Sequence, residues 1–291
     1  ADVRVGSPGA AQAYLGVLQW FDLLHRGKLS VYSSVYVFAR RTPKWRRTRV
    51  PDDALTELLC GALLAPFWGF DMQRAHLPMV VASDASTSYG HGVSIASLPV
   101  DRVRAIARLD AKIDGQPPQE QPRFGERHDL GLLLSDFRAV LSIRAPTEHI
   151  NIMEGRAFLA ALRWILRRRD RFNKRLVLLV DSRVWLGAVS KGRSASMPLN
   201  RLLRRVAVLT MAANVVLHLV FIPSKHNPSD YPSRGVNPNC DRPSKHGAQR
   251  PSRLEKLLRE QEARVQRLID TGMVSPSDLD FEASSSTSFF P

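Results

Sequence analysis

Between residues 77 and 235 the sequence alternates short apolar runs with longer amphipathic segments. The clearest run is Leu176–Val180, which contains only leucine and valine and is followed at once by Asp181. A run this short and without alternation predicts a strand buried on both faces of a sheet. Similar patterns predict strands at residues 78–86, 91–97 and 215–222, and a less regular one near residues 136–146.

Helical periodicity is strongest at residues 152–169, where an apolar stripe runs from Phe158 to Ile165. Two further helices are predicted at residues 183–190 and 199–213. Strands therefore come first, and helices and strands then alternate. This order predicts an α/β fold with a mixed sheet flanked by helices.

The pattern of apolar and polar residues changes at about residues 77 and 236, which predicts three regions. The first two are a helical segment at 1–76 and the α/β domain at 77–235, which is rich in insertions at 99–147. The third, at 236–291, contains a linker, an amphipathic helix at 252–270 and a low-complexity tail. The first residue is Ala1 rather than methionine, so we expect a piece of a longer polypeptide.

The composition is strongly basic, with a formal net charge of +15. The positive electrostatic field of such a chain favours polyanionic partners, and nucleic acid is the first of these. No apolar run approaches the length of a membrane span, and no signal-peptide pattern opens the chain. The two cysteines, Cys60 and Cys240, form neither a disulfide framework nor a zinc motif. We expect an intracellular protein, cytoplasmic or nuclear, that is neither secreted nor bound to a membrane.

Four acidic residues fall at informative places in the predicted elements. Asp84 lies on the first strand, Glu154 in the first turn of the long helix, Asp181 at the end of a central strand and Asp230 after the last strand. Each has an ordinary explanation, as a polar strand end, a helix-dipole partner or a turn residue. If the first strand pairs in parallel with Leu176–Val180, however, Asp84 and Asp181 come side by side and Glu154 lies over the same edge.

Carboxylates this close repel one another and need cations if they are to stay ionised. All-oxygen ligands suit Mg²⁺ or Mn²⁺. Two such ions about 3.5–4 Å apart are a common device for phosphodiester hydrolysis. The sequence therefore predicts a site for two divalent ions on a chain that attracts nucleic acid.

These motifs resemble the ribonuclease H domain of retroelement reverse transcriptases, in particular those of DIRS-type (tyrosine-recombinase) retrotransposons and their relatives. The resemblance covers residues 78–235 through SDAS, INIMEGRAFLAALR, LLVDSRVWLGAVSKGRSAS and FIPSKHNPSDYPSRG. It implies a ribonuclease H-like fold, with Asp84, Glu154, Asp181 and Asp230 as catalytic metal ligands. It also implies cutting of the RNA strand of RNA–DNA hybrids, leaving a 3′-hydroxyl and a 5′-phosphate.

The same resemblance makes residues 1–76 similar to the end of a reverse transcriptase without its polymerase acids. The rest of a reverse transcriptase polyprotein is then an expected partner. Two features depart from the family pattern. The insertion at 99–147 is long, and the histidine that many family members carry well before the last acid has no clear counterpart, because His226 lies only four residues before Asp230.

Polar and basic residues near the acids are the predicted nucleic-acid contacts. Those at 191–196 precede a helix start, where free N–H groups favour anions, although serine capping explains the serines equally well. The full set is Ser86, Ser182, Lys191, Arg193, Ser194, Ser196, Asn200, Lys225, His226 and Arg234.

Two other hypotheses remain open. One is an inactive ribonuclease H-like scaffold that binds nucleic acid or protein without cutting. The other is a different nuclease or a transposase on the same fold, because fold does not fix function. Four acids favour activity, since a scaffold needs none of them and burying them together is destabilising.

Overall fold

A computed structural model describes residues 4–69, 71–110 and 129–236. The chain divides into two compact units, one made of residues 1–127 and 133–244 and the other of residues 128–132 and 245–291. The elements below belong to the first unit. The amphipathic helix predicted at 252–270 lies outside the described residues. Within the described part of the chain, every helix is too short or too polar to cross a membrane.

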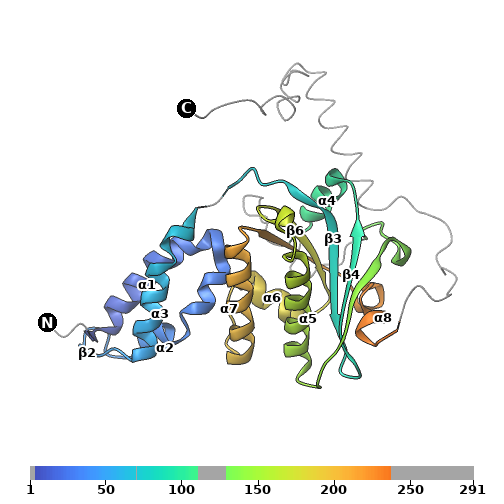
Figure 1. Cartoon of the computed structure of the whole chain (residues 1–291). Coiled ribbons are helices and arrows are strands. Elements are labelled where there is room, and N and C mark those ends of the chain that lie inside the picture. The colour runs from blue at the N-terminus through green and yellow to red at the C-terminus, as the bar shows by residue number, and fades with distance from the viewer. Residues whose placement is uncertain (1–3, 70, 111–128, 237–291) are drawn as a thin grey trace, which may run out of the picture. The chain divides into compact units, whose positions relative to one another are not determined.

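A five-stranded mixed sheet is formed by strands between residues 76 and 221 (Figure 1). Its order is β5-β4-β3-β6-β7, in which β5, β4 and β3 pair antiparallel while β6 is parallel to both β3 and β7. The strands are β3 (His76–Ala85), β4 (Gly90–Ser97), β5 (Arg138–Arg144), β6 (Arg175–Val180) and β7 (Val216–Phe221). The predicted α/β class, the parallel pairing of the first strand with Leu176–Val180 and the irregular third strand are confirmed.

Three helices pack next to the sheet and against one another (Figure 1). They are α5 (Ile150–Ile165), α6 (Arg183–Lys191) and α7 (Met197–Ala212). The stripe from Phe158 to Ile165 is fully buried against strand residues such as Val81 and Leu178. The regular apolar spacing of α5 thus places one face of the helix on the sheet and leaves its polar face outside.

Helix α4 (Val100–Ala107) lies within the region that the sequence presented as an insertion. It contacts β3, β6 and β7, and buries Val103 and Ile106 completely. The helix is only eight residues long, so its periodicity spans about two turns and gives a weak sequence signal.

The N-terminal segment is helical, as predicted, and has its own small core. The core contains Leu15, Leu18, Tyr32, Val35 and Phe38. The segment's elements are β1 (Val5–Gly6), α1 (Pro8–Asp22), η1 (Leu23–Val31), α2 (Ser33–Ala39), β2 (Thr48–Arg49), α3 (Asp52–Leu63) and η2 (Ala65–Trp68).

A buried ion pair lies at the centre of this segment. Lys28 Nζ is 3.8 Å from Asp22 Oδ1, and the Tyr32 hydroxyl donates a 2.7 Å hydrogen bond to Asp22 Oδ2. These partners satisfy charges that would be costly to bury alone.

The remaining described elements are short. They are η3 (Leu134–Asp136), η4 (Arg169–Arg171), η5 (Ser224–His226) and α8 (Asp230–Ser233). The last two follow β7 directly and contribute to the candidate site.

Candidate metal centre

Asp84 and Asp181 are brought together by the register of two parallel strands. Ala82 of β3 is paired with Leu179 of β6, so Asp84 and Asp181 each lie two residues beyond a paired position. Asp84 is the penultimate residue of β3, and Asp181 directly follows β6. The carboxyl ends of parallel strands are where open α/β sheets place ligands.

Glu154 joins the two aspartates from the first turns of α5, the helix that packs on β3 and β4. One carboxylate oxygen from each of Asp84, Glu154 and Asp181 lies within 4.8 Å of the other two. Asp84 and Glu154 are only 5% and 7% exposed. The structure thus assembles three of the four predicted acids at one buried point.

Burial and mutual repulsion disturb the ionisation of this cluster. The pKa of Glu154 is raised to about 9, mainly by burial and also by the charges of Asp181 and Asp84, against a hydrogen bond from the Ala85 N–H that lowers it. The pKa of Asp84 is raised to about 7, mainly by burial and also by the charges of Asp181 and Asp230, against a hydrogen bond from the Ser233 hydroxyl that lowers it. In the absence of a cation, the cluster therefore holds protons near neutral pH.

A loop after β7 supports Asp84. The Ser233 hydroxyl donates to Asp84 Oδ2, and the Asn227 amide lies 3.4 Å from Asp84 Oδ1 while donating to the Ser83 carbonyl at 3.1 Å. The Ser229 hydroxyl donates to the Ala82 carbonyl at 2.9 Å. All three loop residues are buried, so the loop fixes the orientation of the aspartate.

Gly92 on β4 allows the loop to approach the sheet so closely. A Cβ at this position would lie 2.5 Å from the Ser229 carbonyl oxygen and closer still to the Ser233 nitrogen. Only glycine leaves room for this contact between the two backbones.

Asp230, the fourth predicted acid, lies outside the group of three. Its Oδ1 accepts hydrogen bonds from Arg234 Nη2 at 2.7 Å and Nε at 3.0 Å. Its charge still contributes to the raised pKa of Asp84, so it is close enough to repel that carboxylate. Asp230 is therefore near the cluster but engaged by a neighbouring guanidinium.

The chemistry of the three carboxylates fits a divalent cation. Asp181 Oδ1 is buried and has no hydrogen-bond partner among the described residues, although buried polar atoms are almost always paired. A cation at this point would satisfy that oxygen and relieve the repulsion that raises the pKa of Glu154. Asp84, Glu154 and Asp181 could thus hold a metal ion.

The predicted nucleic-acid contacts differ in their surroundings. The hydroxyl of Ser182 accepts from the Trp185 N–H at 3.3 Å and caps α6, whereas Ser196 caps α7 without a side-chain hydrogen bond. The Ser86 hydroxyl lies 2.7 Å from that of Ser88. The buried side chain of Asn200 bonds to other parts of the chain.

The remaining predicted contacts lie in two places. One group lies at the end of α6 and consists of Lys191, Arg193 and Ser194. The side chains of Lys191 and Arg193 are exposed. Lys225 and His226 are exposed in η5, just before Asp230, and Arg234 forms the ion pair with Asp230.

Four residues that support the site were not predicted from the sequence: Gly92, Asn227, Ser229 and Ser233. The only signal was the density of small polar residues in residues 224–234, which is also typical of an ordinary loop. Their partners are more than 130 residues away along the chain, so only the folded structure connects them.

A scan against protein-family models finds no match for this chain, and a search of curated proteins finds no significantly similar sequence.

Proposed function

We propose that this protein is a divalent-metal-dependent endonuclease that hydrolyses the RNA strand of RNA–DNA hybrids as part of a retroelement reverse transcriptase. The observation that carries the proposal is the group of three carboxylates, with ligand oxygens within 4.8 Å of one another at the ends of β3 and β6. The mixed sheet agrees with the ribonuclease H-like fold that the sequence motifs imply.

Each acid has a distinct part in this proposal. Asp84, Glu154 and Asp181 would hold Mg²⁺ or Mn²⁺, because carboxylate oxygens suit these hard ions. Asp230 is the candidate ligand for a second ion, and its bonds to Arg234 compete with that role. Two bound ions would activate water and stabilise the leaving oxygen of an in-line displacement.

Substrate preference rests on charge and on the sequence motifs. The net charge of +15 favours a polyanion, and the resemblance supplies the choice of an RNA–DNA hybrid. Arginine and lysine residues contact phosphates independently of base sequence, so we expect cleavage without strong sequence specificity.

The test is hydrolysis of an end-labelled RNA–DNA hybrid in Mg²⁺ by the wild type and by Asp181→Asn, with a DNA duplex as the substrate control. Asp170→Asn is the matched control variant, because Asp170 is exposed and pairs with Arg168. We expect Asp181→Asn to lose more than about 100-fold in rate, since even residues that only orient metal ligands contribute 10–100-fold. Circular dichroism and thermal melting should show that both variants fold.

Hybrid-specific cleavage that disappears in Asp181→Asn and persists in Asp170→Asn supports the proposal. A folded wild type that binds the hybrid tightly without cutting it would favour the inactive scaffold. Equal cleavage of hybrid and DNA duplex would favour another nuclease on the same fold.

A further inference from the structure

A second site lies where the N-terminal segment meets α6 and α7. A groove of about 660 Å³ is lined on one side by residues of η1 and α2, and on the other by α6 and the connection to α7. Four of its lining residues are basic: Arg40, Arg183, Lys191 and Arg193. Among the described residues that line the groove, none is aspartate or glutamate. The groove therefore has the charge of an anion-binding surface.

The groove also offers an aromatic and aliphatic surface between its cations. The Arg193 guanidinium lies over the Tyr36 ring at 4.9 Å, which joins the two walls. Val37, Val184 and Met197 line the groove and are each more than half exposed. Basic side chains interleaved with apolar ones suit a sugar–phosphate backbone better than an isolated inorganic anion.

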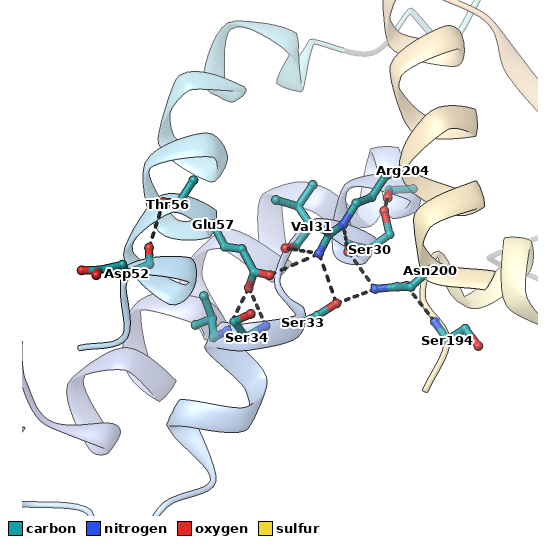
Figure 2. A network of polar contacts seen from close by, with 12 residues as sticks. Ser30, Val31, Ser33, Ser34, Asp52, Thr56, Glu57, Ser194, Asn200 and Arg204 are labelled. Carbon is teal, nitrogen blue, oxygen red and sulfur yellow. Dashed lines mark hydrogen bonds and ion pairs between the residues drawn. The ribbon is translucent and has the colours of Figure 1, made fainter. Parts of the chain in front are cut away.

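A polar network fixes the two walls against each other (Figure 2). Arg204 of α7 donates to the carbonyl of Ser30 at 2.9 Å and to that of Val31 at 3.2 Å, and its Nη2 also lies 3.2 Å from Glu57 Oε1. The other oxygen of Glu57 accepts the N–H groups of Ser34 and Val35 at the start of α2. Every charge in this network therefore has a partner.

Asn200 completes the connection. Its amide donates to the Ser30 carbonyl at 2.9 Å, and its Oδ1 accepts the Ser194 N–H at 3.1 Å (Figure 2). One buried side chain thus holds both η1 and the loop that carries Arg193. The groove is formed before any ligand arrives, which lowers the entropic cost of binding.

Helix α6 connects the metal centre to this groove. Helix α6 begins at Arg183, two residues after Asp181, and ends at Lys191. At about 1.5 Å per residue, the helix carries the chain ~13 Å from the acids to the basic residues at its end. Charges on one strand of a duplex repeat about every 3.4 Å of helix axis, so a phosphate bound at the end of α6 lies a few nucleotides from the one at the acids.

We propose that this groove binds the sugar–phosphate backbone of one strand of the substrate a few nucleotides from the bond that is cut. The inference rests on the proposed nuclease function, since it uses the acids to define the position of the cut. It assigns the N-terminal segment a direct role, because Tyr36 and Arg40 form one wall. Lys191 and Arg193 bind phosphates from the other wall.

The experiment measures binding of a fluorescent RNA–DNA hybrid to the full chain in EDTA, where cleavage plays no part. The double variant Lys191→Ala/Arg193→Ala and the single variant Arg40→Ala are compared with Arg205→Ala. Arg205 is the matched control because it is exposed on α7 and does not line the groove. Each phosphate contact contributes roughly 0.7–0.9 to the slope of log affinity against log salt.

We expect the double variant to bind more weakly and to lose about 1.4–1.8 of that slope. Arg40→Ala should lose about 0.7–0.9, and Arg205→Ala should keep the wild-type value. A second series replaces single phosphates with uncharged methylphosphonates along each strand. Substitutions at one or two positions a few nucleotides away from the cut should weaken binding by the wild type but not by the double variant.

The inference is overturned if the double variant keeps the wild-type salt slope, or if methylphosphonates at every position affect both proteins equally. Failure of the nuclease proposal gives a different result, because the wild type would then bind hybrid with the expected slope and leave it uncut in Mg²⁺.

Discussion

The most informative perturbation is Glu154→Gln, because it separates stability from function. Glutamine has nearly the shape of glutamate and its carbonyl oxygen can still accept the Ala85 N–H, but it never ionises. In the metal-free protein, Glu154 is 7% exposed and the pKa of its carboxyl is raised to about 9, first by burial and then by Asp181 and Asp84. We therefore expect the variant to be more stable than the wild type at alkaline pH.

The sign follows from linkage between protonation and folding. A group whose pKa is higher in the folded state contributes its full stability below its unfolded pKa, and loses it as pH rises through the folded value. For Glu154 this window runs from 4.5 to about 9. Asp84 acts in the same direction over the window from 3.8 to about 7.

The magnitude follows from the same window. At pH 8 the folded Glu154 is mostly protonated and the unfolded one is ionised, so at ~1.36 kcal/mol per pH unit the buried carboxyl costs about 5 kcal/mol. Structural relaxation and water reduce this, so we expect Glu154→Gln to gain roughly 2–5 kcal/mol in the free energy of unfolding at pH 8. The melting temperature should then rise by roughly 5–15 °C for a domain of this size.

The assay is thermal unfolding in EDTA between pH 4 and pH 8, repeated with Mg²⁺. The advantage of the variant should disappear near pH 4, because both side chains are then neutral. Mg²⁺ should stabilise the wild type more at pH 8 than at pH 5, because metal ligands must be deprotonated. The control is Glu148→Gln, which breaks a partly exposed pair with Arg156 (2.8 Å) and should lose at most about 1 kcal/mol.

One result would refute the reasoning. If Glu154→Gln is less stable than the wild type at pH 8 in EDTA, and by more than Glu148→Gln, the protein itself compensates the charge of Glu154. The three acids would then be a structural network with no need of a metal ion.

Two further predictions concern the loop beside Asp84. Gly92→Ala should displace the backbone at Ser233 and lower the free energy of unfolding by about 2 kcal/mol or more, as overpacking does. The control is Gly16→Ala, in an open helical position, which should raise the free energy of unfolding by about 0.5–1 kcal/mol. Thermal melting of both variants tests the difference. Arg234→Ala should release Asp230 and lower the Mg²⁺ concentration needed for half-maximal cleavage several-fold, and an unchanged Mg²⁺ titration would show that this ion pair does not oppose metal binding.

Local sequence patterns predicted most of the regular elements. The unbroken run Leu176–Val180 is a strand with Asp181 at its end, and the stripe from Phe158 to Ile165 is the buried face of α5. These predictions succeeded because burial of a strand or a helix face leaves a periodic record within a few residues. Helix α4 was missed because its two turns give too short a record.

The candidate site was predictable to the extent that it depends on strand ends. Asp84, Asp181 and Glu154 come together because the parallel register of β3 and β6 follows from the order of the elements. The Asp230–Arg234 pair was not foreseen, because an acid in a polar loop has several alternative partners. The support that Asn227 and Ser233 give to Asp84 was equally invisible, since it joins segments far apart in the chain.

The sequence by itself determined the α/β class, the positions of the strands and the identity of the acids at their ends. Tertiary structure alone decided that Asp230 lies outside the group of three acids, and that Arg204 and Asn200 fix η1 and α2 beside α6 to form the basic groove. The physical reason is the range of the interactions. Periodicity is set by neighbours along the chain, whereas hydrogen bonds and charge repulsion depend on distances that exist only once the chain has folded.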